Sequence, residues 1–160
     1  MNLTEVSNIL WRERQLLELL LFKLEEEHLL LASGRSRWLA HATREVETVL
    51  GEIKRVEETR AQQVSAVAVS LGLASTASLR ELAEAAPEPW GGVLTEHREA
   101  FLAATQEIST LAQDNRELLS RGYQAARSLL SSMDGSRVET YSPAGLVTNH
   151  APMRLVDEAI

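Results

Sequence analysis

A leucine recurs every seven residues over the first part of the chain, at Leu3, Leu10, Leu17, Leu24 and Leu31. The positions three residues after the first four of these leucines hold an apolar residue or a glutamate: Val6, Glu13, Leu20 and Glu27. This spacing places the side chains on one face of an α-helix, and a seven-residue period is typical of helices that pack side by side. The sequence therefore predicts a first helix over residues 2–33, about 45 Å long.

The helical pattern continues after a short break at Ser33–Ser36. In this break, Gly34 is the residue expected at a helix C-cap, and Ser36 is expected to cap the next helix. Apolar residues at 3–4 spacing then predict a second helix over residues 37–71, with mixed charges on its outer face. Because the connection is short, we expect the two helices to form an antiparallel hairpin.

A short helix is predicted after the hairpin. Ser78 is followed three residues later by Glu81, which is the pattern of a capping box at a helix N-terminus. Pro87 and Pro89 should end this helix, since proline lacks the N–H group that a helix interior needs.

We expect Trp90–Gly92 to form a corner, after which apolar spacing predicts a third long helix over residues 93–133. Residues 134–160 show no sustained period, so we expect them to form a flexible C-terminal tail. The predicted fold class is all-α: an elongated antiparallel helical bundle of three long helices plus one short helix, with residues 1–133 as its domain. We expect contacts mainly between sequence neighbours, and some apolar surface left for another chain.

Composition narrows the classes of function. The chain has 23 Asp and Glu against 16 Lys and Arg, a net charge of −7, whereas a nucleic-acid-binding protein needs a basic face. It has no cysteine, which removes disulfides and thiolate metal sites and fits a reducing compartment. No apolar run reaches the length of a membrane span, and the N-terminus does not resemble a signal peptide. We expect a cytoplasmic protein with no nucleic-acid partner and no membrane insertion.

Candidate catalytic and metal-binding groups are few. Glu25 and His28 form one Glu-x-x-His pair, but the di-iron bundles that use this spacing need a second pair, and none occurs here. The sequence also lacks a glycine-rich phosphate loop, a nucleophile elbow and a His-Glu-x-x-His motif. We therefore expect no enzyme activity, no metal and no cofactor.

Polar residues and a glycine interrupt the predicted core rows. Two explanations of Glu13 and Glu27 remain open: either arginines pair with them or they are half exposed, or they leave a gap for basic side chains of a partner. We favour the first, because an unpaired buried carboxylate is costly. Asn115 is expected to fix the register of the third long helix, and Gly122 indicates a close approach or a bend.

Two stretches near the C-terminus resemble motifs of the FlgN-like flagellar export chaperones. Leu111–Gly122 has the pattern Leu-x3-Asn-x2-Leu-Leu-x2-Gly, and Thr140–Gly145 contains a Tyr followed by a Gly four residues later. The Leu-rich hairpin, the Ser78–Leu82 stretch and the total length also match, so the resemblance spans nearly the whole chain. The Trp90–Gly92 corner and the tail beyond Gly145 depart from it.

The resemblance implies a non-enzymatic cytoplasmic chaperone of the flagellar type III export pathway. Such a chaperone binds the C-terminal segments of hook–filament junction (hook-associated) proteins, prevents their premature assembly and delivers them to the export gate. The implied partners are those proteins and the gate, with the ATPase complex of the gate as a further candidate and a homodimer left open. The alternative is a structural coiled-coil scaffold or adaptor without a secreted client, which would not need the tail motif.

By family analogy the client site lies on the C-terminal half of the last long helix. The candidates form two neighbouring apolar rows: Leu118, Leu119, Tyr123, Ala126, Leu129, Leu130 and Met133. Packing against the hairpin is the competing explanation; we favour it for Leu118 and Leu129 and leave it open for Leu119, Tyr123, Leu130 and Met133. The resemblance assigns docking on the export gate to Tyr141 and Gly145.

Overall fold

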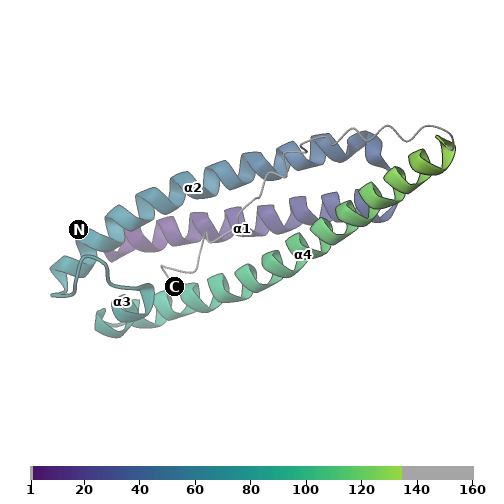
Figure 1. Ribbon diagram of the computed structural model, residues 1–160. Helices are drawn as coiled ribbons and strands as arrows, with labels where there is room; N and C mark the ends of the chain where they lie inside the picture. The colour runs from purple at the N-terminus through teal and green to yellow at the C-terminus, as the bar shows by residue number, and fades with distance from the viewer. Residues whose placement is uncertain (1, 135–160) are drawn as a thin grey trace.

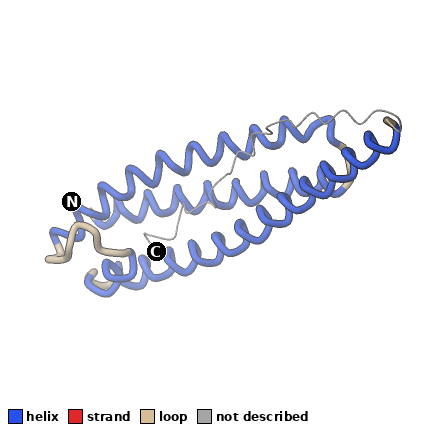
Figure 2. The backbone as a smooth tube through the Cα atoms, viewed as in Figure 1, coloured by secondary structure: helices blue, strands red, loops and turns tan. Residues whose placement is uncertain are grey.

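The computed structural model describes residues 2–134, which form an all-helical bundle (Figures 1 and 2). Its elements are α1 (Leu3–Ala32), the 3-10 turn η1 (Ser36–Trp38), α2 (Leu39–Ser70), α3 (Leu79–Ala85) and α4 (Trp90–Met133). The predicted fold class, with three long helices and one short helix, is confirmed. The tail predicted for residues 134–160 lies outside the described residues, apart from Asp134.

α1 and α2 form an antiparallel hairpin, and α4 runs parallel to α1 (Figure 1). The direction of α4 follows from two contacts with α1: His97 lies beside Ser7, and Asn115, further along α4, lies beside Leu24. We call the end with the α1–α2 turn the tip, and the end with α3 the base.

Among the long helices, α4 packs on α1 and not on α2, the long helix that precedes it in the chain. Within the described residues, no Cα atom of α2 comes within 8 Å of a Cα atom of α4, whereas α1 packs against both helices. The prediction that contacts run mainly between sequence neighbours is therefore wrong for α4. The reason is that α3 carries the chain across the base, so that α4 starts beside the N-terminus of α1 (Figure 1).

A glycine in the left-handed region ends α1. Gly34 has a φ of +69°, and the N–H groups of Gly34 and Arg35 donate to carbonyls in the last turn of α1, each at 3.2 Å. Glycine adopts this conformation without steric cost, so the C-cap prediction is confirmed. Ser36 does not cap α2: it opens η1, and Trp38 precedes α2 without a capping side-chain hydrogen bond.

The base of the bundle holds the capping box of α3 and the start of α4. The Glu81 N–H donates to Ser78 Oγ at 3.2 Å, and the Ser78 N–H donates to Glu81 Oε2 at 2.7 Å, as predicted. The corner predicted at Trp90–Gly92 is wrong, because these residues form the first turn of α4. A Cβ atom on Gly91 would lie 3.0 Å from the carbonyl oxygen of Ala83, so the missing side chain lets α3 pack closely on α4.

The core follows α1, between α2 and α4. Its buried apolar side chains include Leu10, Leu17, Leu20 and Leu24 on α1, Val46, Val49, Ile53 and Val56 on α2, and Leu94, Phe101 and Ile108 on α4. The leucine repeat is therefore buried in the middle of α1, as its period predicts. On α4 burial stops near Asn115: Leu118 is half-buried, and every residue from Leu119 to Asp134 is exposed.

Candidate functional site: the exposed end of α4

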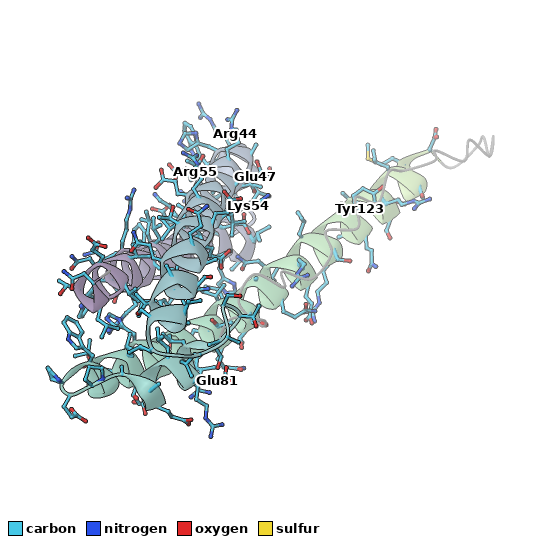
Figure 3. All side chains as sticks on the ribbon, turned by 90° about the vertical axis from the view of Figure 1, so that its left-hand side faces the viewer. Arg44, Glu47, Lys54, Arg55, Glu81 and Tyr123 are labelled. Carbon is cyan, nitrogen blue, oxygen red and sulfur yellow. The ribbon has the colours of Figure 1, made fainter. Side chains whose placement is uncertain are left out.

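The end of α4 extends past the tip of the hairpin (Figure 1). We call residues 118–133 the α4 overhang; at 1.5 Å per residue it is about 22 Å long. Figure 3 shows Tyr123 on this part of α4, well away from α2. Its large apolar side chains are exposed by 53% to 83%: Leu119, Tyr123, Leu129, Leu130 and Met133. Large exposed apolar side chains gathered on one helix are typical of an interaction site.

The apolar side chains of the overhang continue the face of α4 that packs on α1. Phe101, Ile108 and Asn115 follow one another by seven residues and are buried. The same row goes on at intervals of seven, four, three and four residues to Gly122, Ala126, Leu129 and Met133. These intervals keep side chains on one face of a helix. A surface built for helix packing therefore continues where α1 has ended.

Leu118 and Leu129, for which packing on the hairpin is favoured from sequence, have different environments. Leu118 is half-buried, but Leu129 is 64% exposed, so that prediction is wrong for Leu129. The physical reason is that α1 ends at Ala32, too early to cover Leu129. Around Gly122, no described atom lies within 4 Å of the place of a Cβ atom, so no described residue makes the close approach predicted there.

Asn115 lies where α4 leaves α1, and it is only 3% exposed. Its Nδ2 donates to the carbonyl of Leu24 at 3.0 Å and to Glu27 Oε1 at 3.2 Å. His28 Nδ1 donates to its Oδ1 at 2.9 Å, and Thr43 Oγ1 donates to Glu27 Oε2 at 3.0 Å. This cluster joins α1, α2 and α4, so Asn115 fixes the register predicted for it. Glu27 is half-buried and is hydrogen-bonded by neutral groups, not by an arginine.

Glu13 lies in the half of the core nearer the base, with only 1% of its surface exposed. Arg60 Nε of α2 lies 3.4 Å from Glu13 Oε2, and the Arg60 guanidinium also lies 5.8 Å from the centre of the Phe101 ring. Burial raises the pKa of Glu13 to about 7, while the charge of Arg60 lowers it and that of Glu57 raises it further. Glu13 therefore leaves no gap for a partner's basic side chain, in agreement with the favoured explanation.

His97 forms a second buried polar contact between α4 and α1. Arg14 donates to His97 Nδ1 at 3.5 Å, so Nε2 carries the proton and donates to Ser7 Oγ at 3.3 Å. Trp11 meets the imidazole edge to face, with 5.2 Å between ring centres. Burial, followed by the charge of Arg14, lowers the pKa of His97, against a smaller opposite effect of Glu96. The contacts position α4 on α1.

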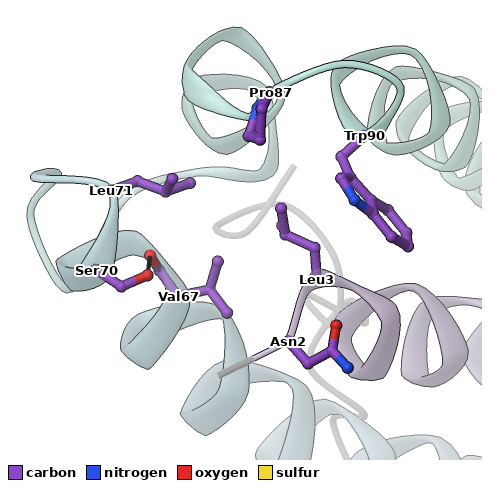
Figure 4. Close-up of a pocket in the computed structure, with 7 residues that line it drawn as sticks. All are labelled: Asn2, Leu3, Val67, Ser70, Leu71, Pro87 and Trp90. Carbon is purple, nitrogen blue, oxygen red and sulfur yellow. Dashed lines mark hydrogen bonds between the residues drawn. The ribbon is translucent and has the colours of Figure 1, made fainter.

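Candidate metal ligands do not gather in the described part of the chain. Within residues 2–134, no three His, Cys, Asp or Glu side chains lie together as a metal site would require, and His28 is hydrogen-bonded to Asn115. A hollow of about 510 Å³ opens at the base, with Leu3 between α2 and the start of α4 (Figure 4). Its lining carries no charged side chain: Asn2, Leu3, Val67, Ser70, Leu71, Pro87 and Trp90.

The tip carries exposed apolar side chains that sequence reasoning missed. Leu29 and Trp38 are exposed by 68% and 55% and line a hollow of about 420 Å³ together with Ala42, Glu26 and Glu45. Leu29 lies outside the heptad row of α1, so the leucine period alone did not single it out. Trp38 lies in the connection between the helices, where periodicity carries no signal.

Comparisons with known proteins find a family match that covers most of the chain. A family model described as FlgN protein matches residues 1–149. No curated protein and no solved structure matches the chain. The matched range includes the α4 overhang; it also includes Tyr141 and Gly145, which lie outside the described residues. Among the described helices, none is both long and apolar enough to cross a membrane.

Proposed function

The chain belongs to the FlgN family of flagellar export chaperones, and on this premise we propose that it binds the C-terminal segments of hook–filament junction proteins. In this proposal the chaperone works in the cytoplasm, covers the assembly surface of its client until export, and delivers the client to the export gate. It acts by binding and carries out no chemical step.

The observation that carries the proposal is the α4 overhang. The row that packs on α1 as far as Asn115 continues to Met133 with large apolar side chains exposed. An amphipathic client helix laid along this row would remove the apolar surfaces of both chains from water, as in helix-in-groove recognition. Folding of a disordered segment on binding costs several kcal/mol, roughly 2–5, which keeps the affinity moderate and allows release.

A coiled-coil scaffold without a secreted client is the second candidate. It is supported by the same exposed row, since two overhangs could in principle cover each other. The family membership favours the chaperone, because a scaffold has no need to release its partner.

The variant L119D/L130D tests the client site. Both leucines are exposed by more than half, so we expect an unchanged circular dichroism spectrum and a melting temperature within about 2 °C of the wild type. Isothermal titration with the C-terminal segment of a junction protein should show an affinity reduced by at least about a hundredfold, because two buried leucines contribute about 1.5–3 kcal/mol each.

The variant Q124D/S128D is the matched control, since it adds the same charge at exposed positions on the side of the overhang that faces away from the apolar rows. It should bind the client segment like the wild type. Full binding by folded L119D/L130D would exclude the overhang as the client site, and unfolding of that variant would show that these leucines belong to the core.

Docking on the export gate is assigned to Tyr141 and Gly145 by resemblance, with the ATPase complex of the gate as a further candidate partner. Both residues lie outside the described part of the chain. The variant Y141A should bind the client segment normally and deliver less client to the gate, measured as the amount of junction protein secreted. Loss of client binding in Y141A would instead assign this tyrosine to the client site.

A further inference from the structure

The α4 overhang is a basic segment of an acidic molecule. Residues 33–44 include Arg35, Arg37 and Arg44 and no acidic residue, and residues 118–133 include Arg121 and Arg127 and again no acidic residue. The whole chain has a net charge of −7. Figure 3 shows Arg44 at the outer surface near the start of α2. The exposed apolar row is therefore flanked on its own helix by positive charge alone, whereas the hollow at the tip is also lined by Glu26 and Glu45.

The covered part of α4 shows how the flanks of this row interact with a neighbouring helix. Glu96 lies beside the row, and Arg14 of α1 approaches it to 3.8 Å between Nη1 and Oε1. Asp114 and Arg121 lie 18 and 25 residues after Glu96, close to five and seven turns at 3.6 residues per turn, so they share its flank. Along this flank the charge changes from negative to positive where α1 ends.

The opposite flank of α4 is basic throughout. Arg98, Arg116 and Arg127 follow one another at 18 and 11 residues, close to five and three turns of the helix. Arg127 makes no ion pair among the described residues, and Arg121 makes only an exposed contact of 3.8 Å with Glu117 of its own helix. The overhang therefore presents an arginine on each side of its apolar row.

We propose that the α4 overhang receives an amphipathic helix with acidic residues along both edges of its apolar face. This inference rests on the proposed function, because the occupant is the client segment. Charges that flank the apolar row of paired helices select the partner, and on the covered part of α4 the flanking Glu96 has a residue of opposite charge, Arg14, beside it. The apolar row alone accepts many amphipathic helices, and the arginines select against basic ones.

The same charges disfavour a second copy of this chain as the occupant. Two overhangs packed on each other would bring Arg121 and Arg127 of one copy to the arginines of the other, and like charges across a helix pair are destabilising. An anionic membrane would also attract the arginines. The face of the row, however, is the one that packs on a helix, α1, further down α4, which favours a helix as the occupant.

Two synthetic peptides test the proposal with the full chain. Each has about 18 residues, enough to follow an overhang of about 22 Å, and the same leucines at heptad positions a and d. One carries glutamate and the other lysine at positions e and g. By fluorescence polarisation we expect the acidic peptide to bind at least about tenfold more tightly at about 50 mM salt, and the preference to shrink at about 500 mM salt.

The variant R121E/R127E should lose or reverse this preference. The control R12E/R55E changes the net charge equally at exposed arginines of α1 and α2 outside the overhang, and should behave like the wild type. Equal binding of both peptides, unchanged in R121E/R127E, would overturn the charge inference and leave the proposed function intact. Failure of both peptides to bind would count against the overhang as a helix-binding surface and so against the proposed function as well.

Two further measurements distinguish the other occupants. Sedimentation of the chain with vesicles containing about 30% anionic lipid should show no binding that depends on Arg121 and Arg127. Analytical ultracentrifugation should show that R121E/R127E does not change the oligomeric state. Arginine-dependent binding to vesicles, or a dimer lost in L119D/L130D, would assign the overhang to a membrane or to a second copy and overturn the proposal.

Discussion

At the scale of single residues, the core of this bundle holds polar groups that a helix bundle does not need for stability alone. The carboxylate of Glu13 is almost fully buried beside Arg60. Burying such a pair costs desolvation free energy that the attraction between the charges need not repay. The raised pKa of Glu13, about 7, means that this cost exceeds the stabilisation from Arg60. The pair nevertheless links α2 to α1 within the core.

The pH dependence of stability should report this raised pKa. The pKa of Glu13 is near 4.5 in the unfolded chain and near 7 in the folded protein. Its contribution to the free energy of unfolding is therefore fully present below about pH 4.5 and is lost as the pH rises through 7. The free energy of unfolding of the wild type should fall relative to E13Q by roughly 3 kcal/mol over this range, at about 1.4 kcal/mol per unit. Urea unfolding of both proteins from pH 4.5 to pH 8 measures the difference.

The comparison with E13Q separates Glu13 from His97, which acts in the opposite direction. The lowered pKa of His97 gives stability above about pH 6.5 that is lost as the pH falls, and both proteins share it. E18Q, at an exposed position of α1, controls for removal of one carboxylate. A wild type that gains stability over E13Q as the pH rises would mean that the pairing with Arg60 outweighs burial.

A second prediction for a single residue concerns the stability contributed by Asn115. The variant N115A removes the donor to Leu24 and Glu27 and the acceptor for His28. Unfolding in urea should show a loss of about 1–3 kcal/mol, because buried partners are left unsatisfied. The control N8A, at an exposed position of α1, should stay within about 0.5 kcal/mol of the wild type. Equal stability of N115A and N8A would show that the cluster contributes nothing to the fold.

At the scale of elements, the start of α4 depends on its contact with α3. Gly91 and Gly92 are neighbours in the first turn of α4, yet a Cβ atom on Gly91 would meet the carbonyl oxygen of Ala83 at 3.0 Å, and one on Gly92 would meet nothing within 4 Å. Close packing therefore explains the glycine at position 91 but not the one at position 92. Helix propensity, which is the same for both residues, does not reveal this difference.

Alanine at each position tests this difference. G92A should raise the free energy of unfolding by up to about 1 kcal/mol, since alanine favours the helix over glycine. G91A should gain less or lose stability, because the backbone of α3 must move away from the new methyl group. Thermal unfolding of both variants provides the comparison. A melting temperature of G91A equal to or above that of G92A would contradict the close packing of α3 on α4.

At the scale of the whole molecule, the bundle divides into a packed part and an uncovered part. The core runs from the base to the cluster around Asn115, and beyond it every residue from Leu119 to Asp134 is exposed. The uncovered part is also the basic one, so the apolar and electrostatic properties of the proposed client site coincide at one end of the molecule.

Truncation should separate the two parts. A chain that ends at Leu118 should keep the melting temperature of the full chain within about 2 °C, because the removed residues bury little surface, and it should lose client binding. A chain that ends at Ile108 also loses Asn115 and should melt at least about 5 °C lower. Differential scanning calorimetry checks both. A large loss of stability at the first truncation would show that the overhang or the tail packs on the bundle.

The positions of the helices were determined by the sequence itself. The leucine period of α1, the glycine after it and the capping box at Ser78 depend on residues within one or two turns, so they can be recognised without the fold. The family resemblance, and not the periodicity alone, placed the candidate site on the last long helix, and apolar spacing then selected its residues, from Leu118 to Met133. The sequence did not predict the first turn of α4 at Trp90, because Gly91 is explained by its packing against Ala83 of α3 and not by local propensity.

Only the tertiary structure decided which helices touch and where the contact stops. α4 packs on α1 and not on α2 because the chain crosses the base through α3, and a helical period carries no information about the partner of a helix. Leu129 is exposed for the same reason: its row has the pattern of a core, but α1 ends at Ala32 before it can cover that turn. An apolar row on a helix indicates that another surface should cover it, and only the lengths and offsets of the packed helices show which turns of α4 the described part of this chain leaves uncovered.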